Sequence, residues 1–344
     1  MLQIRDFTQS EKVTPEYIKI SNCIKTCTED DVLIARYGAS IGKVLTGIAG
    51  AYNVAIMRTI PDTDIIRKRF LYYYLKSSYF QYAILNVGSR AAQAGFNKTD
   101  LAKLEITCPE LSKQDKIVKI LEKVESIIQK RKDQLNALDY IIKARFVEMF
   151  GDVKYGSERW GGKPFKDITI NLDSKRKPVK DADRKRMQGI YPYYGATGIV
   201  DYINDYRQDG DFLLISEDGK ALELRSKPIA FLASGKIWVN NHAHVQQCTD
   251  ECNMIYLMYH INFMDISIWV TGIDQKKLNR ANLDTIPIAL PPIELQEQFA
   301  AFVHQVDKSK LLSLIKLLEQ LITYLYNVFI IYRQDKGEEV EKYE

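Results

Sequence analysis

The sequence lacks the short motifs by which most enzyme active sites are recognised. It has no Walker-type phosphate loop, no Gly-x-Ser-x-Gly elbow and no His-Glu-x-x-His motif. It also has no Asn-Pro-Pro-Tyr or Asp-Pro-Pro-Tyr run, the motif of amino-methyltransferases. The nearest thing to a phosphate loop, residues 37–43, fits no nucleotide-binding fingerprint. These absences predict a chain that is not an enzyme and holds no cofactor of its own.

Long apolar runs are absent as well. No run approaches the 18 or more residues that a membrane helix needs, and the N-terminus has no basic, apolar, small-residue signal pattern. We therefore expect a cytoplasmic protein with no membrane partner. Cysteine is scarce, and an odd count of five without an export signal favours reduced thiols over disulfides.

The overall composition is that of a folded chain. Its 344 residues are enough for two domains of ordinary size, and 46% hydrophobic with 27% charged residues is typical of globular proteins. The net charge of +4 is compatible with a nucleic-acid partner. Many enzymes are equally basic, so charge alone does not identify the partner.

A fifteen-residue pattern occurs twice, and it divides the chain into two repeats. The two copies run from Leu101 to Asp115 and from Leu283 to Glu297, which places them 182 positions apart. Apolar residues, one proline, one glutamine and one acid keep their spacing without an insertion. A repeat this long exceeds the 20 to 50 residues of solenoids, so it predicts a duplicated domain with pseudo-two-fold symmetry.

Each copy of the pattern leads into a long helix-like stretch. We predict globular domains over residues 1–112 and 153–293, helices over 113–152 and 294–336, and a charged tail over 337–344. Residues 113–150 contain no glycine or proline, which predicts one helix of about 36 residues, roughly 54 Å long. Within the second domain, residues 165–170 read as a strand.

Both predicted helices carry apolar residues at heptad spacing, the pattern of a coiled-coil seam. The seam residues are Ile117, Leu121, Val124, Ile128, Leu135, Leu138, Ile142, Leu311, Ile315, Leu318, Ile322, Leu325 and Phe329. The second seam is out of phase with Phe299, Val303 and Val306 upstream, which predicts a local skip near residues 308–310. Two such helices should pair in antiparallel fashion with a domain at each end, although each helix could instead pack onto its own domain. The predicted fold class is α+β, with two mixed α/β domains and a helical coiled-coil spacer.

Cysteine and histidine could also form a zinc site. Cys23 and Cys27 share their spacing with Cys248 and Cys252, and His242 and His244 lie near the second pair. The two pairs fall at different places in the two repeats, which favours partly buried thiols without a metal. Loops rich in Tyr, Asn and Lys could contact DNA, or could be core aromatics and solvated polar turns.

The doubled motif, Leu-x-x-[Leu/Ile]-x-Ile-x-x-Pro-x-[Leu/Ile]-x-x-Gln-[Asp/Glu], resembles that of the specificity subunits of type I restriction-modification systems. The segments before each copy, residues 88–98 and 275–280, are similar to the family's loop that precedes the motif. The runs 191–198, 211–215 and 241–245 agree with the family as well.

This resemblance implies a non-catalytic subunit with two target recognition domains, each of which reads half of a split double-stranded DNA sequence. The helices would set the gap between the halves and dock two methyltransferase subunits, through which restriction subunits join. S-adenosylmethionine, ATP and magnesium would then belong to those partners. The candidate DNA contacts are Arg36, Tyr37, Ser40, Lys43, Ser89, Arg90, Gln93, Asn97, Lys98, Tyr193, Tyr194, Thr197, Lys220, Lys236, Trp238, Asn241, His242, His244, Thr271, Gln275, Lys276 and Asn279.

The repeat is not complete on both sides. By the 182-residue offset Met1 corresponds to Asp183, so residues 151–182 have no counterpart in the first domain. We therefore expect the first domain to be N-terminally short. A scaffold whose globular ends bind proteins, and a fused nuclease or methyltransferase of unusual motif, are the alternative functions.

Overall fold

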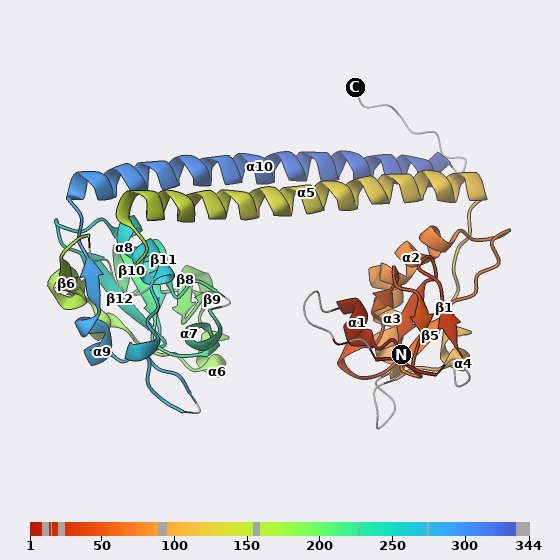
Figure 1. The fold of residues 1–344 in the computed structure, drawn as a ribbon, viewed down its shortest axis with the longest axis horizontal. Coiled ribbons are helices and arrows are strands. Elements are labelled where there is room, and N and C mark those ends of the chain that lie inside the picture. The colour runs from red at the N-terminus through yellow and green to blue at the C-terminus, as the bar shows by residue number, and fades with distance from the viewer. Residues whose placement is uncertain are drawn as a thin grey trace. The chain divides into compact units, whose positions relative to one another are not determined.

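The computed structural model describes residues 1–8, 14, 16–19, 25–88, 95–153, 159–225, 227–273 and 275–334, with backbone alone at 87–88 and 326–334. The chain divides into two units (Figure 1). The first unit comprises residues 1–132 and 315–344, and the second comprises residues 133–314. The predicted tail, 337–344, and Phe329, of which only the backbone is described, lie outside what can be compared. No helix in the described part of the chain is long and apolar enough to cross a membrane.

The first unit combines short strands with helices. Its elements are α1 (Ile4–Thr8), β1 (Thr26–Cys27), β2 (Leu33–Ala35), the 3₁₀ turn η2 (Gly38–Ser40), β3 (Val44–Leu45), β4 (Gly50–Ala51), β5 (Ile56–Arg58), α2 (Lys68–Lys76), α3 (Ser78–Gly88) and α4 (Lys98–Leu101). Strand β2 lies between β3 and β5 in an antiparallel sheet, and β1 pairs with β4. Buried Val32 and Ile34 pack with Leu75, Phe80 and Ile84 of α2 and α3. An apolar strand covered by two helices makes the core of this unit.

The second unit is built on a larger sheet. Its elements are β6 (Gly162–Pro164), η3 (Phe165–Asp167), β7 (Thr169–Asn171), η4 (Asp173–Lys175), α6 (Asp181–Arg184), β8 (Gln188–Gly195), β9 (Gly198–Ile203), β10 (Gln208–Ser216), α7 (Lys220–Leu224), β11 (Ala230–Val239), β12 (Ala243–Cys248), α8 (Met254–Phe263), η5 (Ser267–Trp269), α9 (Arg280–Thr285) and β13 (Pro287–Ala289). The sheet order is β7-β12-β10-β11-β8-β9, and only β11 and β8 run parallel. The strand predicted at residues 165–170 is a 3₁₀ turn followed by β7.

Alternating side chains of β10 face two different cores. Leu213 and Ile215 pack with α8 and α9, in a cluster that includes Leu257 and Leu283. Their neighbours Phe212 and Leu214 point to the opposite face, where strands β8, β11 and β12 supply the packing residues. A continuous apolar strand therefore sits in the middle of the unit, as expected for a strand buried on both faces.

The two long helices confirm the predicted helical stretches. Helix α5 (Leu111–Phe150) and helix α10 (Ile293–Gln334) are each unbroken, and Gly151 follows α5 with a positive φ of 89°. In the second unit the two helices pack together with α8, through the rings of Phe146, Tyr256 and Phe299. Numbering rises along one helix and falls along the other, since Asp139 binds Lys310 while Phe146 contacts Phe299, so the pair is antiparallel here.

The predicted seam is found on α5 but not on α10. Ile142 is buried, and Ile117, Leu121, Val124, Ile128, Leu135 and Leu138 are half-buried. In contrast, Leu311, Ile315, Leu318, Ile322 and Leu325 are all exposed, so the structure corrects this part of the prediction. The predicted skip near residues 308–310 is also wrong.

The predicted seam residues of α10 are exposed because a different side of the helix is turned toward its packing partners. The helix is held by buried Phe299, Val303 and Val306, which pack against the aromatic end of α5. Because α10 continues without a skip, the same side is next occupied by Lys310, Ser313, Leu317, Leu321 and Tyr324, which are buried or half-buried. The aliphatic residues therefore turn outward.

The glutamine of the doubled motif has the same buried role in both copies. Gln114 accepts a hydrogen bond from the N–H of Arg67, the residue that caps α2 (2.8 Å), and donates to the carbonyls of Ile65 (2.8 Å) and Pro109 (2.7 Å). One amide thus joins the start of a long helix to the start of a domain helix.

In the second copy, Gln296 accepts from the N–H of Asn253, the cap of α8 (2.8 Å), and donates to the carbonyls of Glu251 (3.1 Å) and Pro291 (2.7 Å). The partners occupy the same relative positions as in the first copy. The repeat in sequence is therefore a repeat in hydrogen bonding, and we call this arrangement the glutamine clamp.

Candidate nucleic-acid interface

Three loops meet where the central strand of the second unit ends. They are the glycine loop (residues 217–220), the asparagine turn (240–242) and the capping segment (275–279). The N–H of Glu217 donates to the carbonyl of His242 (2.9 Å), and the N–H of Leu278 donates to the carbonyl of Glu217 (2.8 Å). Glu217 therefore connects all three loops through its backbone.

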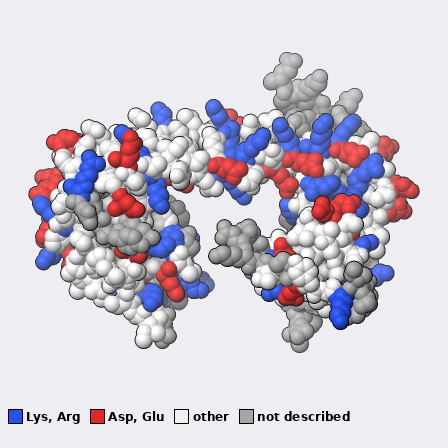
Figure 2. All heavy atoms as spheres, in the orientation of Figure 1, with Lys and Arg blue, Asp and Glu red and all other residues white. Residues whose placement is uncertain are grey.

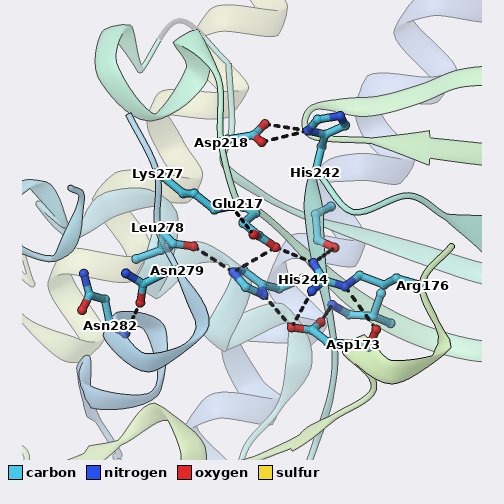
Figure 3. Close-up of polar contacts among 12 residues, drawn as sticks. Asp173, Arg176, Glu217, Asp218, His242, His244, Lys277, Leu278, Asn279 and Asn282 are labelled. Carbon is cyan, nitrogen blue, oxygen red and sulfur yellow. Dashed lines mark hydrogen bonds and ion pairs between the residues drawn. The ribbon is translucent and has the colours of Figure 1, made fainter. Parts of the chain in front are cut away.

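Side chains strengthen the same junction (Figure 3). Nδ1 of His242 lies 2.8 Å from the carboxylate of Asp218, and Nζ of Lys277 lies 3.0 Å from Oε1 of Glu217. Gly219 allows the sharp turn because its φ is +98°, a conformation that glycine adopts without strain. The loops are thus held in one arrangement before any ligand arrives.

Below these loops lies a buried charged network. His244 donates or accepts at both ring nitrogens: Nδ1 is 2.7 Å from Asp173, and Nε2 is 2.9 Å from the carbonyl of Leu278. Arg176 forms ion pairs with both Asp173 and Glu217. Figure 3 shows these side chains converging beneath the glycine loop.

The network sets the ionisation of its two carboxyls. Burial raises the pKa of Asp173, but its hydrogen bond to His244 and nearby Arg176 outweigh burial, so its pKa lies below the usual value. Burial likewise raises the pKa of Glu217, and hydrogen bonds from Arg176 and Lys277 bring it below the usual value. Both groups are therefore anions at neutral pH, and they fix the loops from below.

A fourth loop joins the junction from the neighbouring hairpin. Strands β8 and β9 turn at Ala196 and Thr197, and the hydroxyl of Ser216 donates to the carbonyl of Ala196. The N–H of Asn240 donates to the carbonyl of Tyr194 (3.1 Å). Exposed Thr197 is therefore carried on a turn that is bonded to the other loops.

The predicted contacts in the second unit fall into two groups. Those with exposed side chains are Thr197, Lys220, Lys236, Asn241, His242, Thr271 and Gln275, and Lys276 and Asn279 are half-buried. Thr271 and Lys277 exchange two backbone hydrogen bonds, of 2.9 and 2.8 Å. Lys236 contacts a residue outside these loops, since its ammonium lies 4.7 Å from the centre of the Tyr206 ring.

Four other candidates are buried and cannot contact DNA in this conformation. Tyr193, Tyr194, Trp238 and His244 belong to the interior of the unit. The Tyr193 hydroxyl accepts a hydrogen bond from the N–H of Val179 (2.9 Å), and the Trp238 indole donates to the carbonyl of Lys177 (2.7 Å). The polar ends of these aromatic rings are satisfied inside the fold, so their roles are structural.

The same three loops occur in the first unit. Here the glycine loop is residues 36–43, the asparagine turn is 53–55 and the capping segment is 95–98. The N–H of Arg36 donates to the carbonyl of Ala55 (2.8 Å), and the N–H of Phe96 donates to the carbonyl of Arg36 (3.3 Å). These are the counterparts of the bonds that Glu217 makes.

Further details match between the units. Asn53 accepts from the N–H of Ala55 (3.0 Å), as Asn240 accepts from the N–H of His242 (2.8 Å). Single β-bridges join Tyr37 to Gly95 in one unit and Asp218 to Lys277 in the other. The duplicated chain therefore presents one loop architecture twice.

Two of the candidate asparagines, which lie 182 positions apart in the sequence, are helix caps. Asn97 accepts from the N–H of Asp100 (3.1 Å) at the start of α4, and Asn279 accepts from the N–H of Asn282 (2.9 Å) at the start of α9. A side-chain oxygen at this position stabilises the first turn of a helix. The capping bond uses the amide oxygen of each side chain, so these asparagines have a structural role, and their contact with DNA stays a prediction.

The remaining candidates of the first unit lie on its glycine loop and capping segment. Tyr37, Lys43 and Lys98 are exposed, and Arg36 and Ser40 are half-buried. The guanidinium of Arg36 donates to the carbonyls of Phe96 (3.3 Å) and Val54 (3.5 Å). Ser89, Arg90 and Gln93 lie outside the described residues.

Sequence reasoning missed the residues that hold the junction together. Asp173, Arg176, Glu217, Asp218 and Lys277 were not candidates, although Arg176 lies in a basic run. No local pattern identifies them, because the contacts join distant segments, such as Asp173 and His244, which are 71 positions apart. The matching glycines, Gly38 and Gly219, were the signal that could have located the loops.

The long helices carry charges of both signs. Figure 2 shows Lys and Arg interspersed with Asp and Glu along α5 and α10 on the face in view. Some of these charges are paired, as Lys310 is with Asp139 (2.7 Å). The helices of this face therefore present no broad field of one sign.

The described residues show no group of three or more His, Cys, Asp or Glu that could hold a metal ion. Cys23, one of the zinc candidates, lies outside them. The hydrogen bond to Cys248 and burial both raise the pKa of Cys252. Cys248 and Cys252 are free thiols that form no disulfide.

Comparison with known proteins agrees with this architecture. Residues 2–137 and 157–323 match the family model described as the type I restriction modification DNA specificity domain. The chain belongs to this family. The two matched regions each contain one set of the three loops.

Curated relatives cover only part of the chain. A putative type I restriction enzyme specificity subunit from Haemophilus influenzae is 38% identical over 144 residues, which is 42% of this chain and 36% of that protein. The chain thus aligns with about a third of that relative's length.

Two solved structures share the fold. The type I restriction-modification S subunit from M. genitalium has a TM-score of 0.54 at 15% identity, with 89% of this chain and 84% of that chain covered. A structure described as explaining complex assembly and conformational transition of the type I R-M system has a TM-score of 0.50 at 12% identity, with 90% and 83% covered. At these identities the likeness concerns the fold.

Proposed function

We propose that this chain is the sequence-reading subunit of a type I restriction-modification complex and that it binds a split double-stranded DNA target. The observation that carries the proposal is the loop junction that is built twice, once in each unit, with the same hydrogen bonds. Two similar surfaces fit a target of two parts. The bases read by each unit can differ because the side chains on the loops differ.

The exposed side chains of the loops suit this task. In the second unit Asn241 and Lys220 offer an amide and a cation, which pair with adenine and guanine edges in the major groove. Thr197 can hold a phosphate or a base edge. In the first unit Lys43, Lys98 and Tyr37 are the corresponding exposed groups. The internally bonded junction keeps these side chains in place, which reduces the entropy lost on binding.

The long helices would separate the two readers and dock the catalytic partners. The glutamine clamp in each repeat fixes the first turn of a long helix to its domain, so a change of helix length would change the gap between half-targets. We propose two methyltransferase subunits as partners, one for each repeat, with restriction subunits joined through them. S-adenosylmethionine, ATP and magnesium would act in those subunits, and this chain would supply no catalytic group.

The test is methylation mapping with the complex of this chain and its methyltransferase. Asn241→Ala combined with His242→Ala should alter or relax one half of the methylated sequence and leave the other half and the gap unchanged. Lys43→Ala combined with Tyr37→Ala should affect the opposite half. Each lost base contact should reduce discrimination by about 1–3 kcal/mol.

The control is Tyr140→Ala, an exposed change on α5, which should leave both halves intact. Binding without sequence preference at any salt concentration would contradict the proposal, since phosphate contacts alone give salt-dependent but sequence-blind affinity. Unchanged half-targets in both double variants would favour a scaffold instead.

A further inference from the structure

His242 and His244 are close in sequence but differ in how their ring nitrogens are bonded. Both nitrogens of buried His244 have partners, which are Asp173 and the carbonyl of Leu278. His242 uses Nδ1 alone, which lies 2.8 and 3.0 Å from the two carboxylate oxygens of Asp218. Among the described residues its Nε2 has no hydrogen-bond partner. His244 is therefore saturated inside the fold, whereas His242 is oriented through one nitrogen and open at the other.

The carboxylate of Asp218 decides which ring nitrogen of His242 carries the hydrogen. An ionised carboxylate only accepts hydrogen bonds, so Nδ1 is the donor in this contact. The Asp218 side chain is only 13% exposed, whereas the His242 side chain is 47% exposed. Nε2 of the neutral imidazole is then an acceptor on a half-exposed side chain. In the major groove, the amino groups of adenine and cytosine are the donors that suit such an acceptor.

The backbone holds both side chains in this arrangement. The N–H of Glu217 donates to the carbonyl of His242 (2.9 Å), which places Asp218, the next residue, beside the asparagine turn. A β-bridge joins Asp218 to Lys277 of the capping segment. The N–H of His242 donates in turn to the side-chain oxygen of Asn240 (2.8 Å). Figure 3 shows the contact between Asp218 and His242 separate from the buried charged network, so the pair is a distinct part of the junction.

The first unit has different residues at the same two positions. By the matching backbone bonds, Tyr37 corresponds to Asp218 and Ala55 corresponds to His242. The ring of Tyr37 lies against Gly95, since a Cβ added at Gly95 would be only 2.5 Å from Cδ1 of the ring. Gly95 does not have a positive φ. The ring of Tyr37, and not the backbone conformation, therefore requires glycine at this position.

We propose that Asp218 and Gly95 are positioning residues of the two DNA-reading junctions. Asp218 orients the imidazole of His242, and Gly95 seats the ring of Tyr37, so each sets one base preference through its neighbour. The inference rests on the proposed function, because it assigns roles within the surfaces that read DNA. Side chains that are fixed before binding lose less entropy on contact, which makes their positioning residues part of the specificity.

The first test is a double-variant cycle in the complex of the full chain with its methyltransferase. The measurement is the methylation rate of DNA substrates that differ at one base pair. Asp218→Ala should reduce discrimination at one base pair of one half-target by about 5-fold or more, and His242→Ala should do so at the same base pair. The double variant should lose no more, since Asp218 acts through His242. Additive losses, or losses at different base pairs, overturn the role of Asp218.

Two further variants separate positioning from folding. Asp218→Asn keeps an oxygen that can accept from Nδ1 of His242, so it should retain most of the discrimination that Asp218→Ala loses. The matched control is Asp250→Ala, which removes an exposed acid of the same unit outside the loops and should change no base preference. An Asn variant that loses as much as the Ala variant overturns the hydrogen-bonding role.

The ring of His242 can also be followed without DNA. The chain has four histidines, so nitrogen NMR of the labelled rings in the full chain can resolve each of them. Asp218→Ala should shift the Nδ1 and Nε2 signals of His242 toward those of a ring with mixed tautomers. The signals of His244, which has its own partners, should stay unchanged. Unaltered His242 signals in this variant contradict the proposal.

The test of the first unit uses the same methylation assay. Gly95→Ala should reduce discrimination at one base pair of the other half-target, at the base pair that Tyr37→Ala affects. The double variant should lose no more than Tyr37→Ala alone, because the ring that the added methyl group displaces is gone. The control is Gly161→Ala, a glycine without a positive φ and with no atom within 4 Å of an added Cβ. Full discrimination in Gly95→Ala overturns the role of Gly95.

The positioning roles and the proposed function can fail separately. A wild-type complex that methylates DNA without sequence preference contradicts the proposed function. A wild-type complex with a split target whose base preferences survive both Asp218→Ala and Gly95→Ala contradicts the positioning roles alone.

Discussion

Arg36 in the first unit and Glu217 in the second hold equivalent places, directly after the central strand of each sheet. Both connect the same three loops with equivalent backbone hydrogen bonds, yet their side chains carry opposite charge. Arg36 is half-buried and donates to neutral carbonyls of its own loops. Glu217 is buried and is matched by Arg176 and Lys277.

The difference shows that one loop arrangement can be stabilised in two ways. An arginine needs only carbonyl acceptors, which any loop supplies. A buried carboxylate needs a cation, and Arg176 supplies it from outside the three loops. The loops of the second unit therefore depend on a residue outside them, whereas Arg36 bonds to carbonyls of the other two loops of its own unit.

The largest effect should come from Arg176→Met. Removal of this cation leaves the buried carboxylates of Glu217 and Asp173 without the partner that they share, which should lower the free energy of unfolding of the second unit by about 3–5 kcal/mol. Arg36→Met should cost the first unit only about 1 kcal/mol, because solvent can replace its bonds to carbonyls. Hydrogen exchange of peptides from each unit measures the two losses separately.

Lys277→Met is the matched control, because it removes a half-exposed cation from the same carboxylate. Its effect should stay below about 1 kcal/mol. Equal losses for Arg176→Met and Arg36→Met would remove the distinction between the two junctions.

A change that should affect both units alike is the loss of the glutamine clamp. Gln114→Leu and Gln296→Leu each leave one buried N–H and two carbonyls without partners, and each should destabilise its unit by about 2–4 kcal/mol. Hydrogen exchange at the first turns of α2 and α8 should rise in the respective variant. Gln298→Leu, an exposed change on α10, should have little effect. If only one of the two variants lost stability, the same hydrogen bonds would contribute differently to the stability of the two units.

The smallest expected difference is in pH dependence. The folded pKa values of Asp173 and Glu217 lie below their unfolded values, so they add stability above about pH 4, and this is lost as the pH falls through the folded values. The net effect is modest because burial opposes the hydrogen bonds. Between pH 5 and pH 3 the N–H of Leu278 should lose protection more than the N–H of Phe96, because the first unit has an arginine, and not a carboxylate, at the position of Glu217. Equal loss at both sites would count against this account, and in Glu217→Gln the difference should shrink.

The sequence was sufficient for the features that repeat along the chain. The doubled motif predicted the duplication, and the spacing of apolar residues predicted both long helices. The sequence did not show which side of α10 packs against α5, because the side with the most aliphatic residues was taken as the seam. The offset of 182 would have identified the correct side, since it maps the seam residues Ile117, Leu121 and Val124 of α5 onto Phe299, Val303 and Val306 of α10.

The candidate contacts failed where side chains serve the fold. Tyr193 and Trp238 are as aromatic and polar as a DNA-binding residue, but their polar atoms bond to backbone groups from distant segments. Asn97 and Asn279 lie before short helices whose starts were not recognised, so their capping role was missed. In each case the deciding contact is non-local or depends on a helix of only four to six residues.

In the glutamine clamp, each glutamine side chain forms hydrogen bonds to main-chain atoms and, among the described residues, to no other side chain. Gln114 and Gln296 bind backbone carbonyls, which every amino acid provides, and backbone N–H groups, which every amino acid except proline provides. The residues at the joint can therefore change without altering its bonds. Such a joint would let the sequence of either domain change while the hydrogen bonds at the start of its long helix are kept.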